Sequence, residues 1–573
     1  MYSLMLMLLV TLAAQADVEI NTTNFPDVKF RNYMLSLYPE GYMTTEQVND
    51  LTELNVQNKG IENLKGVELL TGLKVLDCSN NRIGTLDLKL NTELTSLSCW
   101  NNNMLVLNVN NNPNLTFLAC NDNRLSTLKL TLLSKLEKLY CFNNQLTSIN
   151  LPTAATSALE IINCSNNQFM SLVVNNYRNL TTINAQNNLS LTGVNCAFNA
   201  LTTLDLTGCT AMKQLWCYYN SNLSGITGLA DCTGLTMFVL DNCSFSSLDL
   251  EPFTKLTFLN CSNNQLTSLD LSTLTALQKF YCRGNQISSL DLSGKADLQE
   301  VYCDNNRLGS LNIGGCTALR VLDCFNNQFL STITNLTNCT ALSQINCGNC
   351  IIDNLDGITR LTNLSSLIAN NNRLTEFWAS GMNTLYNLNL EDNNYLTKIW
   401  ALNNPVLNTL SCRNCPSLKQ LVCTRNDLSW LDVSGCTSLV DCTCYLNHIA
   451  DEGMTTLVNS LPKRSADSPG ELFVYYKANE NNVMTDAQIA IAQRKNWQSK
   501  KYNGYVWDIM TVSLLVDVDG DGTMTIGDVS ALVDLILRGT VSVEDYPAAD
   551  VDFDGEITVK DVTDLIDLIL NGD

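Results

Sequence analysis

The sequence predicts a repeat solenoid, a parallel β-sheet arc with short convex strands and turns, with small caps and a small all-α domain after it. Three observations support this fold class. A sequence motif recurs at regular spacing along most of the 573 residues, as LDCSNNRIGTLDLK at 76–89 and LNCSNNQLTSLDLS at 259–272. The segments flanking the repeats break the pattern. Residues 512–573 contain fifteen acidic and two basic side chains, which sets this tail apart chemically.

The repeat pattern LxxLxCxxNxL indicates one coil of backbone for about every 21 residues. Alternate residues of a strand face opposite ways, so Leu76 and Cys78 point inward while Asp77 points outward. About eighteen coils, stacked roughly 4.8 Å apart, would form an arc roughly 85 Å long. The cysteine column contains Cys78, Cys99, Cys120, Cys141 and Cys164, and later Cys261, Cys282, Cys303, Cys324 and Cys347.

The repeated asparagine and cysteine predict two structural roles. Asparagine suits the turn because its side chain can bond backbone groups of its own or the neighbouring coil. Cysteine stands where other coils have leucine or alanine, so we expect buried, reduced thiols that act as small hydrophobes. A disulfide framework and metal ligation at CRNC (412–415) are the alternatives. A second column, also interpreted as core, contains Cys209, Cys232, Cys316, Cys339 and Cys436.

The cysteine column shifts by half a coil at two places. Its spacing falls to 11 between Ala185 and Cys196, and again from Ala401 through Cys412 to Cys423. Half a coil separates one face of a solenoid from the other. We therefore predict that this half of the repeat changes face near residue 190 and changes back near residue 410, with strand ladders on both halves.

The in-phase columns resemble leucine-rich repeat proteins, and the resemblance covers residues 61–447. It implies an N-terminal cap at 17–60, where Phe30, Met34 and Leu37 have helical spacing and MTTEQVNDL offers a helix start. YPEGYMTTEQ lacks the carboxylates of a calcium loop. Residues 448–511 are similar to a C-terminal cap and predict helix, strand, helix and final strand; a small catalytic module is the alternative. The single histidine, His448, provides no catalytic triad.

The N-terminus indicates export. Residues 1–16 combine an apolar run with Ala14-Gln15-Ala16, a small-x-small cleavage signal, so the mature chain is expected to start at Asp17. A membrane anchor is the alternative, although the run is short for a span. We expect a secreted or cell-surface protein with no membrane span after cleavage. The net charge of −22 argues against nucleic acid as a partner.

The acidic tail contains two loops of calcium-binding spacing. DVDGDGTMTIGD (517–528) and DVDFDGEITVKD (550–561) lie 33 residues apart and each place aspartates at positions 1, 3, 5 and 12. Clustered carboxylates at this spacing suit Ca²⁺, with a main-chain carbonyl at position 7, so two ions are expected. The predicted ligands are Asp517, Asp519, Asp521, Thr523 and Asp528, then Asp550, Asp552, Asp554, Glu556 and Asp561.

An apolar stripe at helical spacing follows each loop, and the two stripes are expected to pack together. They comprise Val529, Leu532, Val533, Ile536 and Leu537, then Val562, Leu565, Ile566, Ile569 and Leu570. One helix per loop and aspartate at position 12 make residues 512–573 similar to type I dockerins. That resemblance implies attachment to a cohesin domain on a scaffold of plant-polysaccharide degradation. Ile526-Gly527 and Val559-Lys560 replace the family's Ser-Thr pairs, which suggests a divergent cohesin or another protein partner.

These features predict a non-enzymatic binding protein whose repeats bind a protein ligand. A carbohydrate-binding accessory of a polysaccharide-degrading complex is the first alternative, and a glycoside hydrolase is a remote one, because the repeats single out no pair of carboxylates. Outward-facing aromatic residues suit sugars and protein ligands alike, although cross-strand stacking would also explain them. They are Trp100, Tyr140, Phe142, Trp216, Tyr218, Tyr281, Tyr302 and Phe325.

Overall fold

The computed structural model describes residues 17–476, 480–511, 516–521, 523–539, 546–552 and 556–571. The expected signal peptide, residues 1–16, lies outside them. The chain divides into two compact units, Met1–Asp291 and Leu292–Asp573. Among the described residues, no helix has the length and apolar character needed to cross a membrane.

The first unit begins with a small helical cap. Asp27 starts α1 (Val28–Leu37) by accepting hydrogen bonds from the amides of Lys29 and Phe30. A reciprocal capping box of Thr44 and Gln47 starts α2 (Thr45–Asp50), as the sequence predicts. Phe30 and Met34 are buried, whereas Leu37 at the end of α1 is exposed. A two-stranded antiparallel sheet, β1 (Val18–Glu19) and β2 (Tyr42–Met43), completes the cap.

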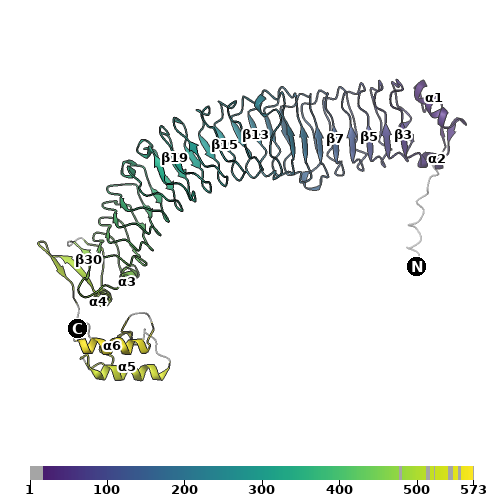
Figure 1. Ribbon diagram of the computed structural model, residues 1–573. Helices are drawn as coiled ribbons and strands as arrows, with labels where there is room; N and C mark the ends of the chain where they lie inside the picture. Colours follow the sequence, from purple (N-terminus) through teal and green to yellow (C-terminus); the bar gives the residue numbers. More distant parts are fainter. Residues whose placement is uncertain are drawn as a thin grey trace, which may run out of the picture. The chain divides into compact units, whose positions relative to one another are not determined.

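Two parallel strand ladders form the coils of the first unit (Figure 1). The central residue of each short strand pairs with its counterpart one coil away, as Leu76 does with Leu97. The first ladder starts inside the expected cap and contains β3 (Glu53–Asn55), β4 (Val75–Asp77), β5 (Ser96–Ser98), β6 (Phe117–Ala119), β7 (Lys138–Tyr140), β8 (Ile161–Asn163), β10 (Thr182–Asn184) and β12 (Thr203–Asp205). The second contains β9 (Ser171–Val173), β11 (Gly193–Asn195), β13 (Gln214–Trp216), β14 (Met237–Val239), β15 (Phe258–Asn260) and β16 (Lys279–Tyr281), after which comes β17 (Leu290–Asp291).

The predicted change of face near residue 190 is confirmed. Cys164 follows β8 in the first ladder, whereas Cys196 and Cys261 follow β11 and β15 in the second. Between residues 161 and 216, successive strands alternate between the two ladders, so both halves of these coils carry a strand. The cysteine column therefore lies on the first ladder up to Ala185 and on the second ladder from Cys196 onward, 11 residues later.

The second unit repeats this arrangement and ends in a cap. The third ladder contains β18 (Glu300–Tyr302), β20 (Val321–Asp323), β22 (Gln344–Asn346), β23 (Ser366–Ile368), β25 (Asn387–Asn389) and β27 (Thr409–Ser411). The fourth contains β24 (Glu376–Trp378), β26 (Lys398–Trp400), β28 (Gln420–Val422), β29 (Asp441–Thr443), β30 (Gly470–Tyr475), β31 (Trp497–Tyr502) and β32 (Trp507–Ile509). A separate pair joins β19 (Ser310–Asn312) to β21 (Thr332–Thr334). Cys412 follows β27 and Cys423 follows β28, so the step between ladders near residue 410 is present.

The C-terminal cap continues the fourth ladder. α3 (Asp451–Ser460) leads into β30, which pairs in parallel with β29, and α4 (Asp486–Arg494) leads into β31. This is the predicted order of helix, strand, helix and strand. The predicted final strand is in fact a hairpin, because β32 turns back antiparallel to β31. Short 3₁₀ turns occur at η1 (Val67–Leu69), η2 (Ala154–Thr156), η3 (Leu229–Asp231), η4 (Leu336–Asn338) and η5 (Ile358–Arg360).

The repeated asparagine connects one coil to the next. The buried Asn144 amide donates to the carbonyl oxygens of Cys141 and Phe142 in its own coil, at 3.1 and 3.2 Å, and of Cys120 in the preceding coil, at 3.1 Å. Its oxygen accepts from the Leu125 amide at 2.9 Å. One side chain thus bonds four backbone groups of two coils: it accepts from the Leu125 amide and is one of two donors to each of the three carbonyls. The predicted role of the asparagine column is confirmed.

All 24 cysteines are buried and free of disulfide bonds, as the sequence predicts. Burial raises the pKa of the Cys164 thiol to about 12, with a contribution from neighbouring Cys209. The second column does more than fill space: the Cys209 thiol donates to the Ala185 carbonyl 24 residues earlier, and the Cys436 thiol donates to the Cys412 carbonyl. Buried Asn188 makes the same contact with the carbonyl of Cys164. Cysteine here replaces asparagine as a small donor between coils.

The tail forms two helices. α5 (Ile526–Arg538) and α6 (Val559–Asn571) pack together, and η6 (Pro547–Ala549) precedes the second helix. Thr525 caps α5 through its hydroxyl, and Gly539, at φ 83°, ends it in the left-handed conformation that glycine tolerates.

Candidate metal centre

The first acidic loop gathers carboxylates immediately before α5. One ligand atom each from Asp517, Asp519 and Asp521 lies within 4.8 Å of the others. Asp528, fully buried in the first turn of α5, accepts hydrogen bonds from the amides of Val518 at 2.6 Å and Thr525 at 2.7 Å. Asp528 therefore folds the loop back onto the helix N-terminus, where a negative charge is favourable.

The second loop repeats this closure 33 residues later. Buried Asp561 accepts from the amides of Val551 at 2.6 Å and Thr558 at 2.7 Å. One ligand atom each from Asp550, Asp552 and Asp561 lies within 4.8 Å of the others. The two loops thus have equivalent backbone contacts at equivalent positions. Asp554 lies outside the described residues, as do Gly522 and Gly555.

The predicted ligands at position 7 have different surroundings in the two loops. The Thr523 amide and hydroxyl both donate to the Asp521 carboxylate, at 2.8 and 2.7 Å. Glu556 lies three residues before the start of α6 at Val559. The sequence pattern found the carboxylates but missed Thr525 and Thr558, whose amides hold the position-12 aspartates.

The carboxylate groups of the first loop repel one another. The Asp521 amide donates to Asp519 and by itself lowers the pKa of that carboxyl group, but desolvation and the charges of Asp521, Asp528 and Asp517 outweigh it. The pKa of Asp519 is therefore raised above its ordinary value. Like charges in one site disfavour the ionised form, and a cation among them relieves the repulsion.

Position 11 distinguishes the two loops. In the first loop it is Gly527, and a Cβ atom there would lie 2.7 Å from Asp519 Oδ2. In the second it is Lys560, whose ammonium group contacts the Asp552 carboxylate. The first loop therefore keeps position 11 free of any side chain, whereas the second places a positive charge against one of its predicted ligands.

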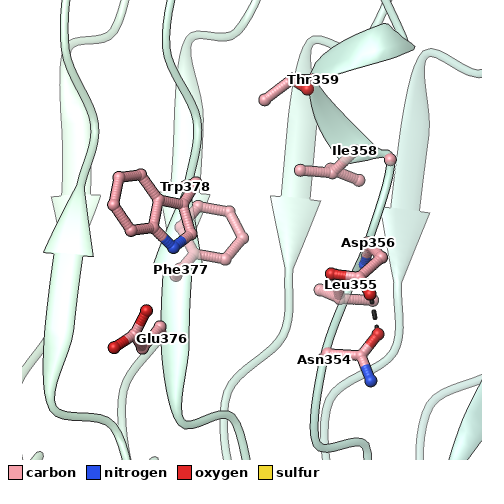
Figure 2. Close-up of a pocket in the computed structure, with 9 residues that line it drawn as sticks. Asn354, Leu355, Asp356, Ile358, Thr359, Glu376, Phe377 and Trp378 are labelled. Carbon is pink, nitrogen blue, oxygen red and sulfur yellow. Dashed lines mark hydrogen bonds between the residues drawn. The ribbon is translucent and has the colours of Figure 1, made fainter.

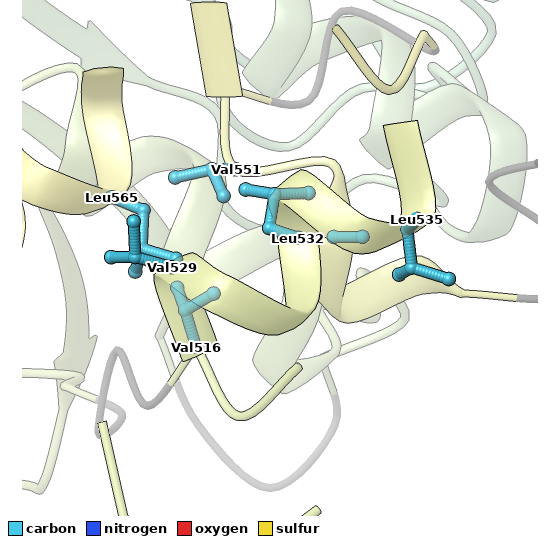
Figure 3. Close-up of a cluster of buried hydrophobic side chains, with 7 residues drawn as sticks. Val516, Val529, Leu532, Leu535, Val551 and Leu565 are labelled. Carbon is cyan, nitrogen blue, oxygen red and sulfur yellow. The ribbon is translucent and has the colours of Figure 1, made fainter. Parts of the chain in front are cut away.

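A small hydrophobic cluster holds the two loops together (Figure 3). It joins residues before and within both helices: Val516, Val529, Leu532, Leu535, Ala549, Val551 and Leu565. The predicted packing of the two stripes is only partly correct. Leu535 is buried although the stripe omitted it, whereas Val533, Leu537, Ile566 and Leu570 are exposed. The cluster fills one side of each helix, so the far side of the predicted stripe faces solvent.

The donor set fits a hard cation. Carboxylate oxygens converge in both loops, and oxygen ligands are those that Ca²⁺ takes. The residues that would hold the ion are the loop aspartates, and a bound cation would supply the positive charge that these loops lack. Among the described residues, the two aspartate clusters are the only groups of three His, Cys, Asp or Glu side chains with ligand atoms this close. CRNC is therefore not part of such a group.

Comparison with protein families agrees with this arrangement. Residues 254–294 match the family profile "Leucine Rich repeats (2 copies)", and residues 515–570 match "Dockerin type I domain". The chain thus carries leucine-rich repeats and a C-terminal type I dockerin domain, which is a calcium-binding domain. Both families are non-catalytic binding domains.

Individual proteins and solved structures are similar to parts of this chain. Internalin J of Listeria monocytogenes is 39% identical over 71 residues, which are 12% of this chain and 8% of that protein. A solved structure entitled "Functional domain of InlJ from Listeria monocytogenes includes a cysteine ladder" is 25% identical, covers 82% of this chain and 85% of its own, and has a TM-score of 0.27. YopM from Yersinia enterocolitica is 22% identical, with 70% and 83% covered and a TM-score of 0.29.

The predicted aromatic surface is divided between ladders. Trp100, Tyr140 and Phe142 belong to coils of the first ladder, and Trp216, Tyr218 and Tyr281 belong to coils of the second. Tyr302 is in β18 and Phe325 follows β20, both in the second unit. All eight are half-buried.

Several of these rings also stack on neighbouring side chains. The Phe117 and Tyr140 ring centroids are 5.7 Å apart, those of Phe198 and Tyr218 5.1 Å, and those of Phe258 and Tyr281 5.2 Å. These contacts favour the stacking role that the sequence left open.

Proposed function

We propose that this is an exported, non-enzymatic binding protein whose repeats bind a protein ligand and whose tail, loaded with two calcium ions, attaches it to a cohesin-type partner. The observation that carries the proposal is the tail: two carboxylate-lined loops, each closed by a buried aspartate onto a helix that keeps an apolar face exposed. The proposed organisation is a signal peptide (1–16), a cap (17–60), repeats (61–447), a second cap (448–511) and a dockerin (512–573).

The exposed helix faces supply the proposed docking surface. On α5, Ile526 and Leu537 are 70% and 77% exposed, with Val533 between them. On α6, Val559 and Leu570 are 69% and 76% exposed, with Ile566 between them. Each residue of the first set is 33 positions before its counterpart in the second, so either helix can present an equivalent surface. Such unpartnered apolar side chains are typical of interaction sites.

Calcium supports this surface indirectly. Both helices begin at the loops, and the hydrophobic cluster between them is small, so the domain needs a further source of stability. In the proposal, the ligands are the ten loop residues predicted from the sequence, with Thr523 and Glu556 contributing carbonyl oxygens. Binding of the ion only to the folded tail would then order both docking faces.

For the repeats, a protein ligand is proposed rather than a glycan. The predicted aromatic residues lie in coils of both units, and the rings of Tyr140, Tyr218 and Tyr281 each contact a neighbouring phenylalanine. Nothing in their arrangement favours a sugar subsite. The export proposal rests on the sequence of residues 1–16.

The test is capture of the full chain by a panel of immobilised cohesin domains, with calcium or with excess chelator. Leu537→Asp and Leu570→Asp are tested singly and together, and Leu189→Asp, at a 66% exposed position in the repeats, is the matched control. Each single variant should still bind through its intact helix, whereas the double variant should lose capture. Undiminished capture in chelator, or by the double variant, would refute the proposed attachment.

A further inference from the structure

A hollow opens beside the first strand of the fourth ladder, away from the metal loops. β24 begins this ladder and pairs with β26. One coil earlier, at residues 354–356, the structure has a loop instead of a strand, and Gly357, at φ 87°, turns the chain into η5. The missing strand leaves a space of about 240 Å³ between this loop and β24. Figure 2 shows Trp378 and Glu376 on the strand, with Asn354 and Asp356 on the loop beside it.

The Trp378 indole is the main apolar surface of this hollow. It is 44% exposed and contacts the ring of Trp400 on the next strand, with centroids 4.2 Å apart at 63°. Trp400 is itself held by a 2.9 Å hydrogen bond from its Nε1 to Gln420 Oε1. Trp378 therefore packs against Trp400 and also lines the hollow.

The hollow is acidic. Asp356 and Glu376 line it, and no lysine or arginine does. Asp356 has no ion-pair partner among the described residues. Glu376 is 3.2 Å from Lys398, but the two side chains are 41% and 44% exposed, so this is a weak surface pair that a better partner can replace. The net charge of −22 adds to the attraction for a cation.

We propose that this hollow receives an arginine side chain of the protein ligand. A guanidinium group is planar, stacks on an indole face and presents a fork of N–H donors to carboxylates. Lysine would gain the charge without the stacking, and a neutral sugar would gain the stacking without the charge. This inference rests on the proposed function, because it specifies one contact of the protein-binding repeats.

The experiment observes Trp378 directly in the full chain. The protein is labelled with 5-fluorotryptophan, the Trp378 resonance is assigned in the ¹⁹F NMR spectrum with Trp378→Phe, and N-acetyl-arginine amide is titrated. N-acetyl-citrulline amide, a neutral molecule of nearly the same shape, is the ligand control. Trp430, 46% exposed, is the internal control residue.

We expect the Trp378 resonance to shift saturably with the arginine compound, with a dissociation constant on the order of fivefold lower than for citrulline. Trp430 should not respond in this way. Asp356→Asn combined with Glu376→Gln should remove the preference for arginine, and 1 M salt should weaken it because the site is exposed.

Equal binding of the two compounds, or no response of Trp378, would overturn the inference. A saturable shift with cellobiose and none with arginine would also overturn it, because it would indicate a sugar site. The calcium-dependent capture by cohesins does not involve Trp378. If cohesins capture the chain but the Trp378 resonance does not shift, only this inference fails. If the Trp378 resonance shifts but cohesins do not capture the chain, the proposed attachment fails.

Discussion

Replacing Lys560 with glutamine should tighten calcium binding by the second loop about fivefold. The Lys560 ammonium group contacts Asp552, a predicted ligand, so a bound ion and this ammonium group compete for one carboxylate. Two unit charges about 4 Å apart interact by about 1 kcal/mol in water, so a doubly charged ion next to an ammonium group costs about 2 kcal/mol. The Lys560 side chain is 63% exposed and can turn away. About half of that cost, roughly 1 kcal/mol, should therefore remain.

Isothermal titration calorimetry on the full chain can measure each loop separately. Asp517→Ala isolates the second loop, and Asp550→Ala isolates the first. Lys560→Gln is then compared with the parent in the Asp517→Ala background. The reciprocal change, Gly527→Lys in the Asp550→Ala background, should weaken the first loop, with Gly527→Ala as the control for adding a side chain. A change of less than about twofold on removing Lys560 would refute the electrostatic reasoning.

Three further results are expected. Calcium removal, or Asp517→Ala combined with Asp550→Ala, should raise hydrogen exchange throughout α5 and α6 but leave the repeats protected; unchanged exchange in chelator would contradict a metal-dependent fold. In denaturant without reductant, most of the 24 cysteines should titrate as free thiols, whereas native protein at pH 8 should react slowly, because all the thiols are buried and burial raises the pKa of most of them, to about 12 for Cys164; fewer than about a third free would contradict the core role. Asn144→Ala should lower the free energy of unfolding by about 3 kcal/mol, measured by chemical denaturation, because it removes four buried hydrogen bonds and leaves the Leu125 amide without this partner. The partly exposed Asn114→Ala should change it by about 0.5 kcal/mol or less.

The repeats could be predicted closely because the structure of each coil depends on residues close together in the sequence. The spacing of leucine, cysteine and asparagine sets which residues point inward, and the same spacing recurs in every coil. The change of ladder could also be predicted from the sequence. A shift of the cysteine column by half a coil moves it to the other half of the coil, where the second ladder lies. The aspartate spacing of the tail was equally local, since each loop closes on an aspartate a few residues away.

Other features depend on contacts between segments that the spacing does not specify. A helical stripe of five apolar residues is wider than the surface one neighbouring helix can cover, so only the packing of α5 against α6 decided that Leu535 is buried and Leu537 exposed. The contact of Lys560 with Asp552 depends on how the second loop closes. The hollow beside Trp378 exists because the preceding coil lacks a strand at that position, and an absent strand has no motif of its own. The sequence by itself therefore determined the coil, its core and its acidic loops, whereas the tertiary structure decided which apolar and charged side chains remain available to a partner.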